Sequence, residues 1–189
     1  SKVFDLLNNK NNRVNKNKIG IIAGGSDPKN CLFKIFKLIN FAMYPDHTFT
    51  FYYGIDNIGK INKISDFVIS SKNTYNNVKL EKFDHNEINT NYIIISAFGV
   101  STFEFLSLGK PIISFAHSLK NLNSLNIFEN KTKSLLNVGL INNINSEVLN
   151  QYIKKLLFES KFNLKLRSKA IKTINFEGIE NVTKILVNE

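Results

Sequence analysis

Two glycine-containing turns are the features of this sequence best suited to chemistry. The first is Ala23–Asp27 (AGGSD) and the second is Ala97–Thr102 (AFGVST); each follows a short apolar run. Each also precedes an expected helix, whose first amide groups lack intrahelical partners and, with the helix dipole, favour an anion. Glycine allows the backbone to approach a phosphate closely, and hydroxyl groups can donate hydrogen bonds to its oxygens. The turns therefore predict a phosphate site, with ordinary capped turns as the alternative.

The elements around these turns alternate between short β-rich runs and helical stretches, which is typical of a parallel sheet covered by helices. Strands are expected at 18–23, 48–53, 78–83, 92–97, 111–115 and 138–141. Helices are expected at 28–41, 60–71, 101–108 and over most of 146–189, where Gly178 precedes a last amphipathic helix. The sequence predicts an α/β fold, a Rossmann-like doubly wound parallel sheet of about six strands with helices on both faces.

Particular residues indicate where two of the expected helices begin and end. Asp27 precedes Pro28, the pattern of an N-cap followed by proline at the first helical position. Gly109 supplies a left-handed stop after the helix at 101–108, and Pro111 prevents its continuation.

The order of the strands brings the two turns together. In a doubly wound sheet of order 3-2-1-4-5-6, the first and fourth strands are neighbours, and ligands bind at their carboxyl ends. The two turns then lie on opposite sides of one crevice. Glu104 lies one helical turn beyond Ser101. Its carboxylate either complements the helix dipole or accepts the hydroxyls of a ribose.

Composition narrows the class of protein. The 189 residues suit one domain, and the net charge is +10. The basic residues are nearly all lysines, with Arg13 and Arg167 as the exceptions, and they are spread along a chain that is also rich in Asn. Proteins that recognise base edges or bind phosphates bidentately rely on arginine, so we expect no nucleic-acid partner. The charge still favours an acidic small molecule such as a nucleotide diphosphate.

The remaining composition favours a cytoplasmic protein. No apolar run approaches the roughly 18 residues of a membrane span, and the polar, Asn-rich start at 1–18 does not resemble a signal peptide. The single cysteine, Cys31, excludes an internal disulfide and fits a reducing compartment.

Four stretches carry a resemblance to a known family, and they are Ile21–Asn30, Ile94–Glu104, Leu106–Pro111 and Glu177–Val182. There the sequence resembles the C-terminal domains of GT-B nucleotide-sugar enzymes. These include the MurG-like glycosyltransferases. The PseG/SpsG group is more similar, and it comprises UDP-sugar hydrolases of pseudaminic-acid synthesis and related spore-coat polysaccharide proteins. The resemblance covers about residues 18–187.

The resemblance implies UDP or a UDP-sugar as ligand, with no further cofactor. It assigns nucleotide binding to Gly24, Gly25, Ser26, Gly99, Ser101, Thr102 and Glu104. The first three would face the sugar side of the diphosphate, Ser101 and Thr102 would hold phosphate oxygens, and Glu104 would hold the ribose. Sugar contacts are expected from Asn121 and Asn123, in the segment where the family carries an Asn-Gln pair. Leu122 occupies the Gln position, and Phe98-Gly99 replaces a glycine pair, so the sugar stays open.

The resemblance also implies that nucleotide-sugar binding and catalysis belong to different domains. Residues 1–17 would form a connector or tail, and residues 18–189 the nucleotide-sugar-binding half. In such enzymes the catalytic base usually comes from an N-terminal domain, which is missing here, so we expect no catalytic residue in this chain. The function implied is that of the C-terminal half of a glycosyltransferase or UDP-sugar hydrolase of surface polysaccharide or nonulosonic-acid biosynthesis.

Two other functions stay open. An NAD-binding domain would use Asp56 as its ribose acid, although the first turn lacks the third glycine of that fingerprint. A non-catalytic Rossmann-like binding domain would keep the fold without turnover. His47, His85 and His117 show no metal-ligand spacing, so no metal site is expected. His117 lies near the crevice and could contact a ligand.

Overall fold

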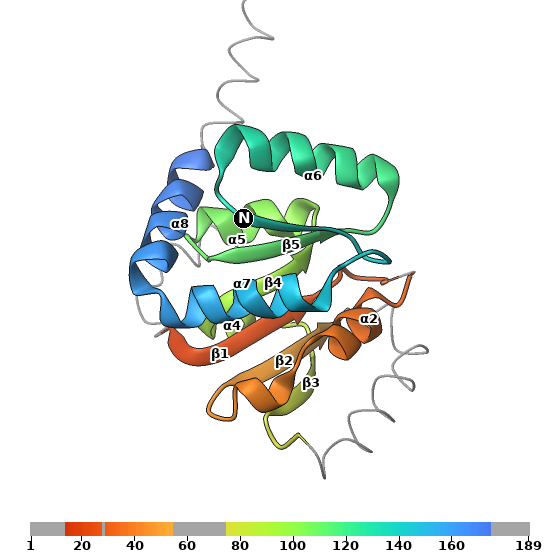
Figure 1. Ribbon diagram of the computed structural model, residues 1–189, viewed down its shortest axis with the longest axis vertical. Coiled ribbons are helices and arrows are strands. Elements are labelled where there is room, and N and C mark those ends of the chain that lie inside the picture. The colour runs from red at the N-terminus through yellow and green to blue at the C-terminus, as the bar shows by residue number, and fades with distance from the viewer. Residues whose placement is uncertain (1–13, 28, 55–74, 175–189) are drawn as a thin grey trace, which may run out of the picture.

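The structure, a computed structural model, describes residues 14–27, 29–54 and 75–174. Its centre is a six-stranded, all-parallel sheet of order β3-β2-β1-β4-β5-β6 (Figure 1). The strands are β1 (Asn15–Ile22), β2 (Thr48–Tyr53), β3 (Val78–Lys82), β4 (Asn91–Ala97), β5 (Ile112–Ala116) and β6 (Leu136–Leu140). The predicted fold class and the order 3-2-1-4-5-6 are confirmed.

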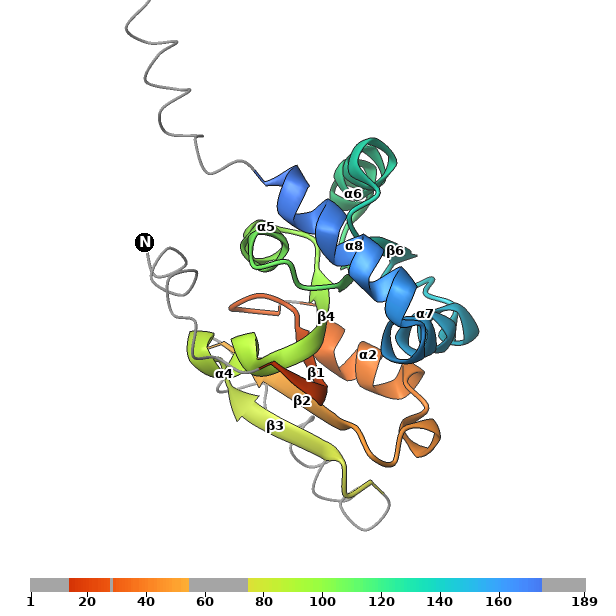
Figure 2. The same ribbon diagram turned by 90° about the vertical axis from the view of Figure 1, so that its left-hand side faces the viewer.

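Helices cover both faces of the sheet (Figures 1 and 2). They are α2 (Cys31–Leu38), the 3₁₀ turn η1 (Phe41–Met43), α4 (His85–Thr90), α5 (Val100–Ser107), α6 (Leu119–Thr132), α7 (Ser146–Phe158) and α8 (Ser160–Thr173). Residues of α2, η1 and α7 share one hydrophobic core, and residues of α4, α5 and α6 share the other. Helix α8 packs against both α5 and α7. No helix in the described ranges is both long and apolar enough to cross a membrane.

The central strands are apolar on both faces, which explains their continuous hydrophobic runs. In β4, Ile93 and Ile95 point into the core shared by α2 and α7, whereas Ile94 points into the opposite core. All three isoleucines are fully buried. Because successive side chains of a strand face opposite sides, burial on both sides requires the unbroken apolar run seen in the sequence.

The first helix is shorter than predicted. Helix α2 begins at Cys31, not at residue 28, and ends at Leu38 before the separate turn η1. The N-cap position belongs to Asn30, which adopts the left-handed conformation with φ 52°. The chain first makes a turn in which the Asn30 amide donates to the Asp27 carbonyl at 3.1 Å. This extra turn delays the helix and removes Asp27 from the predicted N-cap position.

The other helix and strand boundaries differ less from those predicted. Gly109 has φ 65°, which confirms the left-handed stop after α5. Strand β6 begins at Leu136, two residues before the prediction, and β1 begins at Asn15, inside the predicted connector. Helices α4 and α6 were not predicted from the sequence. The helix expected at 60–71, the acid Asp56 and the region around Gly178 lie outside the described residues.

Candidate functional site

A hollow of about 260 Å³ lies where β1 and β4 end. Both glycine turns contribute to it, so the structure brings together the two segments that the sequence singled out. Its lining residues are Ile22, Ala23, Gly24, Ala97, Phe98, Gly99, Val100, Ser101 and His117. Gly25 and Ser26 are exposed in the first turn but do not line the hollow. The site lies at the switch point of the sheet, where ligands of doubly wound folds bind.

The first turn depends on two glycines. Gly24 has φ 84°, a left-handed conformation that L side chains rarely adopt. Gly54, directly after β2, packs against the backbone of Gly25, and a Cβ at Gly54 would collide with the Gly25 carbonyl oxygen. Gly54 therefore positions the first turn. The local sequence around Gly54 does not reveal this contact.

Asp27 occupies the start of α2 with its own negative charge. Its side chain is buried, and its carboxylate accepts hydrogen bonds from the amides of Cys31 at 2.6 Å and Leu32 at 3.1 Å. These are the groups that a bound anion would otherwise use at a helix N-terminus. The expectation that both helices offer free amides is therefore wrong for α2, because Asp27 takes the place of the anion.

The start of α5 remains open to the hollow. Val100 and Ser101 form the first turn of α5 and line the hollow. Amide groups at these first positions have no carbonyl partner within the helix. The Gly99 amide, by contrast, donates to the Thr102 hydroxyl at 3.2 Å. The free amides, the Ser101 hydroxyl and the helix dipole can together bind a phosphate.

Thr102 supports this turn from inside. It is fully buried, and its hydroxyl donates to the Ala97 carbonyl at 3.1 Å while it accepts from Gly99. The Ser96 hydroxyl lies 3.4 Å away. The Thr102 side chain thus stabilises the turn and does not line the hollow, which leaves Ser101 as the hydroxyl at the site.

Asn121 connects the second turn to the loop after β5. Its side-chain oxygen accepts from the His117 amide at 3.2 Å, and its side-chain nitrogen donates to the Phe98 carbonyl at 3.0 Å. This bridge holds His117 beside the second turn, where it lines the hollow. Asn123 is exposed on α6 and lies outside the lining. The sugar contacts expected from Asn121 and Asn123 stay predictions.

Glu104 is partly exposed on α5, one turn beyond Ser101. Within the described part of the chain, its carboxylate forms no hydrogen bond and no ion pair. It does not line the hollow, so its predicted contact with a ribose stays a prediction.

An apolar rim lies beside the hollow. Phe98, Phe103 and Phe128 form a cluster of edge-to-face and tilted rings, with ring centroids 5.2 to 5.6 Å apart. Val100 and Leu119, at the first positions of α5 and α6, are 77% and 69% exposed. Large apolar side chains this exposed beside a concave site are typical of an interaction surface.

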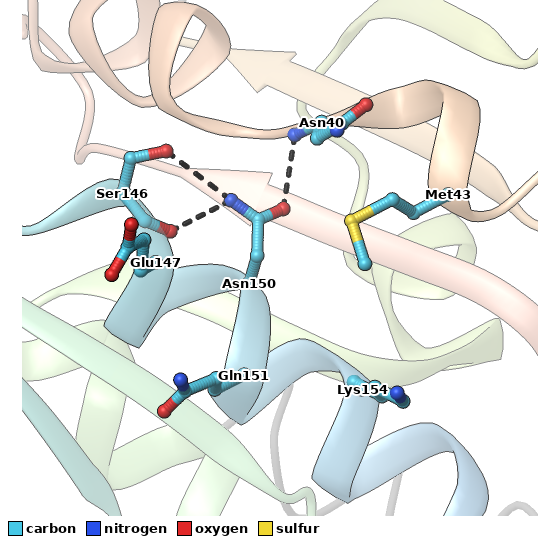
Figure 3. A pocket seen from close by; sticks show the side chains of 7 residues that line it. All are labelled: Asn40, Met43, Ser146, Glu147, Asn150, Gln151 and Lys154. Atoms are coloured by element: carbon cyan, nitrogen blue, oxygen red, sulfur yellow. Dashed lines mark hydrogen bonds between the residues drawn. The ribbon is translucent and has the colours of Figure 1, made fainter.

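A second hollow, of about 350 Å³, lies between α7 and the segment after α2 (Figure 3). Asn150 crosses this region: its side-chain oxygen accepts from the Asn40 amide at 2.9 Å, and its nitrogen donates to the Ser146 carbonyl at 2.7 Å. The bond with Asn40 joins α7 to the start of η1, and the bond with Ser146 fixes the Asn150 side chain within α7, so Asn150 has a structural role. In the part of the chain that the structure describes, no group of three or more His, Cys, Asp or Glu could hold a metal.

Comparison with known proteins identifies the fold. No protein-family model and no curated protein matches the chain. The C-terminal domain of a glycosyl transferase group 1 family protein (LpcC) from Francisella tularensis is 14% identical. The match has a TM-score of 0.60 and covers 91% of this chain and 89% of that domain. The chain therefore has the α/β fold of such a C-terminal domain.

Two larger enzymes give similar matches. The UDP-GlcNAc 2-epimerase of Methanocaldococcus jannaschii, solved with UDP-GlcNAc and UDP, is 15% identical with a TM-score of 0.61 over 100% of this chain. MurG of Acinetobacter baumannii is 11% identical with a TM-score of 0.61 over 91% of this chain. The chain spans only 49% and 52% of these two proteins, which is about half of each.

Proposed function

We propose that the chain binds the diphosphate of a UDP-sugar and forms the C-terminal half of a glycosyltransferase or UDP-sugar hydrolase. One observation carries the proposal: both glycine turns line one hollow at the switch point, and the open N-terminus of α5 faces it. The structural neighbours that bind UDP-sugars share this fold and support the choice of ligand.

The two turns have different roles in this proposal. Phosphate oxygens bind to the amides of Val100 and Ser101 and to the Ser101 hydroxyl. The first amides of a helix have no carbonyl partner within it, and these groups lie at the positive end of α5. The first turn faces the sugar, because the carboxylate of Asp27 next to it repels a phosphate. Glu104 accepts hydrogen bonds from the ribose, and His117 adds a polar contact at the wall of the hollow.

A second domain completes the site. The hollow of about 260 Å³ is smaller than the roughly 300–1,000 Å³ typical of small-molecule sites. The exposed side chains of Val100 and Leu119 beside it would be covered by a partner domain. We place that partner in an N-terminal half of the protein, which would also supply the catalytic base.

The finer assignment rests on the motifs. The first turn and its flanks resemble the PseG/SpsG group, so we assign the protein to surface polysaccharide or nonulosonic-acid biosynthesis in the cytoplasm. The buried, unpaired thiol of Cys31 fits a reducing compartment.

Calorimetry with the 189-residue chain tests the proposal. We expect heat from UDP and a weaker signal from CDP. Ser101→Ala should reduce UDP affinity about tenfold, because it removes a hydrogen bond to a charged group. Ser124→Ala, on the exposed face of α6, is the matched control and should bind UDP normally. Heat from NAD without heat from UDP would refute the proposal.

A non-catalytic binding domain is the second candidate. The observation in its favour is Phe98, which lines the hollow, whereas many members of the family that the sequence resembles carry a glycine at this position. Activity of the full-length protein distinguishes the two: release of UDP from a UDP-sugar supports an enzyme, and binding without turnover supports the binding domain.

A further inference from the structure

Helix α8 carries a large share of the charge of this protein. Between Ser160 and Thr173 it contains five basic residues and no Asp or Glu. The whole chain has a net charge of +10, so one 14-residue helix supplies a charge equal to half of that excess. Helices α6 and α7 are of similar length but carry a net charge of only +1 each. The basic residues are therefore spread along the chain, as described from the sequence, but five of them gather in this one helix.

The two sides of α8 differ sharply. Asn163, Leu166 and Ala170 are at most 5% exposed and pack against the domain. The other side exposes Leu164 by 64% and Ile171 by 57%. These two side chains are seven residues apart, which places them two helical turns from each other in one row.

A row of lysines runs beside the apolar pair. Lys161, Lys165 and Lys172 are all exposed, and their spacings of four and seven residues align them along the helix. Figure 2 shows α8 on the outside of the domain, crossing from α7 towards α5 and α6. The outer side of α8 is therefore a basic surface bordered by two exposed apolar side chains, of which Ile171 also lies against Gly109.

We propose that this surface, formed by Lys161, Leu164, Lys165, Ile171 and Lys172, binds the headgroup region of an anionic lipid bilayer. Lysines beside exposed aliphatic side chains are the arrangement of helices that lie in a membrane interface. The ammonium groups bind lipid phosphates, while the aliphatic side chains enter the boundary with the acyl chains. The flexible lysine stems let both contacts form at once.

The same observations disfavour other occupants. A nucleic-acid backbone would satisfy the lysines but offers no apolar surface for Leu164 and Ile171. The one arginine of the helix, Arg167, lies near the Tyr92 ring, with its guanidinium carbon 6.0 Å from the ring centroid. The exposed cations are therefore all lysines, which bind phosphate as point charges and lack the fork that clamps it bidentately.

Co-sedimentation with vesicles tests the proposal. The 189-residue chain should bind vesicles of phosphatidylcholine with phosphatidylglycerol and should not bind phosphatidylcholine alone. Changing Lys161, Lys165 and Lys172 together to Gln should weaken binding on the order of 100-fold, since each lysine near an anionic surface contributes about fivefold. The matched control changes the exposed lysines Lys79, Lys82 and Lys131 to Gln, with the same loss of charge. It should lower binding much less.

A second variant separates insertion from charge alone. Leu164→Ser with Ile171→Ser keeps every charge, and we expect roughly tenfold weaker binding for each side chain that enters the interface. Circular dichroism confirms that each variant is folded. Equal losses in the two triple-lysine variants would overturn the proposal, and so would full binding by the serine variant. Tighter binding to poly(U) than to the anionic vesicles would also overturn it. UDP calorimetry on the same variants is independent of these outcomes.

Discussion

Replacing Asp27 by Ala should destabilise the protein more than replacing an exposed Asp or Glu by Ala. The carboxylate of Asp27 is 4% exposed and accepts two hydrogen bonds from the first amides of α2, at Cys31 and Leu32. Those two residues are themselves buried, so water cannot replace the lost acceptor. Loss of a helix cap costs about 0.5–2 kcal/mol, and hydrogen bonds to a charged group contribute about 1.5–3 kcal/mol. We therefore expect a loss of about 2.5 kcal/mol.

Urea and thermal unfolding measure this loss. For a domain of this length, about 2.5 kcal/mol corresponds to a drop of about 6 °C in Tm. It also lowers the urea midpoint by about 1 M. Asp27→Asn should lose less, since its amide oxygen still accepts a hydrogen bond and Asn tolerates the left-handed φ of 34° at this position. Asp46→Ala, at an exposed turn, is the control. A change below about 0.5 kcal/mol in Asp27→Ala would refute the capping role.

Three further perturbations test the rest of the structure. Gly54→Ala should lower the unfolding free energy measured with urea by about 2–4 kcal/mol, because its Cβ would collide with Gly25. Gly99→Ala is the control and should leave stability unchanged, because its Cβ would meet nothing within 4 Å. Equal losses in the two variants would contradict this packing. Asn121→Ala should lower UDP affinity several-fold by releasing the loop that holds His117, and unchanged calorimetry would show that the bridge does not position the site. Burial lowers the pKa of Lys110 to about 8, with repulsion from Arg167 as a smaller cause. At pH values between about 8 and the pKa of about 10.4 in the unfolded chain, Lys110 is mostly deprotonated in the folded state but protonated in the unfolded state. The unfolding free energy of the wild type minus that of Lys110→Met should therefore rise by about 2 kcal/mol from about pH 7.5 to 9.5. A difference that stays constant with pH would argue against Lys110 as the source.

The sheet could be predicted from the sequence because its central strands are buried on both faces. Strand β2 matches the expected bounds of 48–53, and β4 differs from its prediction by one residue. Continuous apolar runs of this kind are typical of strands that are covered on both faces at the centre of a parallel sheet. The convergence of the two turns followed from the strand order, since parallel strands β1 and β4 end at the same edge.

Helix α6 could not be predicted in the same way. It buries only Leu125 fully and is rich in Asn, so the sequence offers little apolar periodicity. Its N-cap is Ser118, which accepts from the Asn121 amide at 3.2 Å. Without the helix, Asn121 was interpreted only as a sugar ligand, and its bonds to the loops at Phe98 and His117 were not foreseen. Local sequence does not reveal hydrogen bonds between loops that are distant along the chain.

The contrast between the two helix starts explains how one crevice can distinguish two ends of a ligand. Both turns have glycine and a hydroxyl residue, and by sequence they looked equivalent as anion sites. Asp27 changes the first turn: its carboxylate satisfies the amides of α2 and leaves a negative charge there. The second turn carries no such charge. There the neutral hydroxyl of Thr102 accepts a hydrogen bond only from the Gly99 amide, so the amides of Val100 and Ser101 can bind a ligand. Under the proposed function, a ligand with a charged phosphate at one end and a neutral, hydroxyl-rich sugar at the other would therefore be oriented by electrostatics, with its phosphate at α5 and its sugar towards α2.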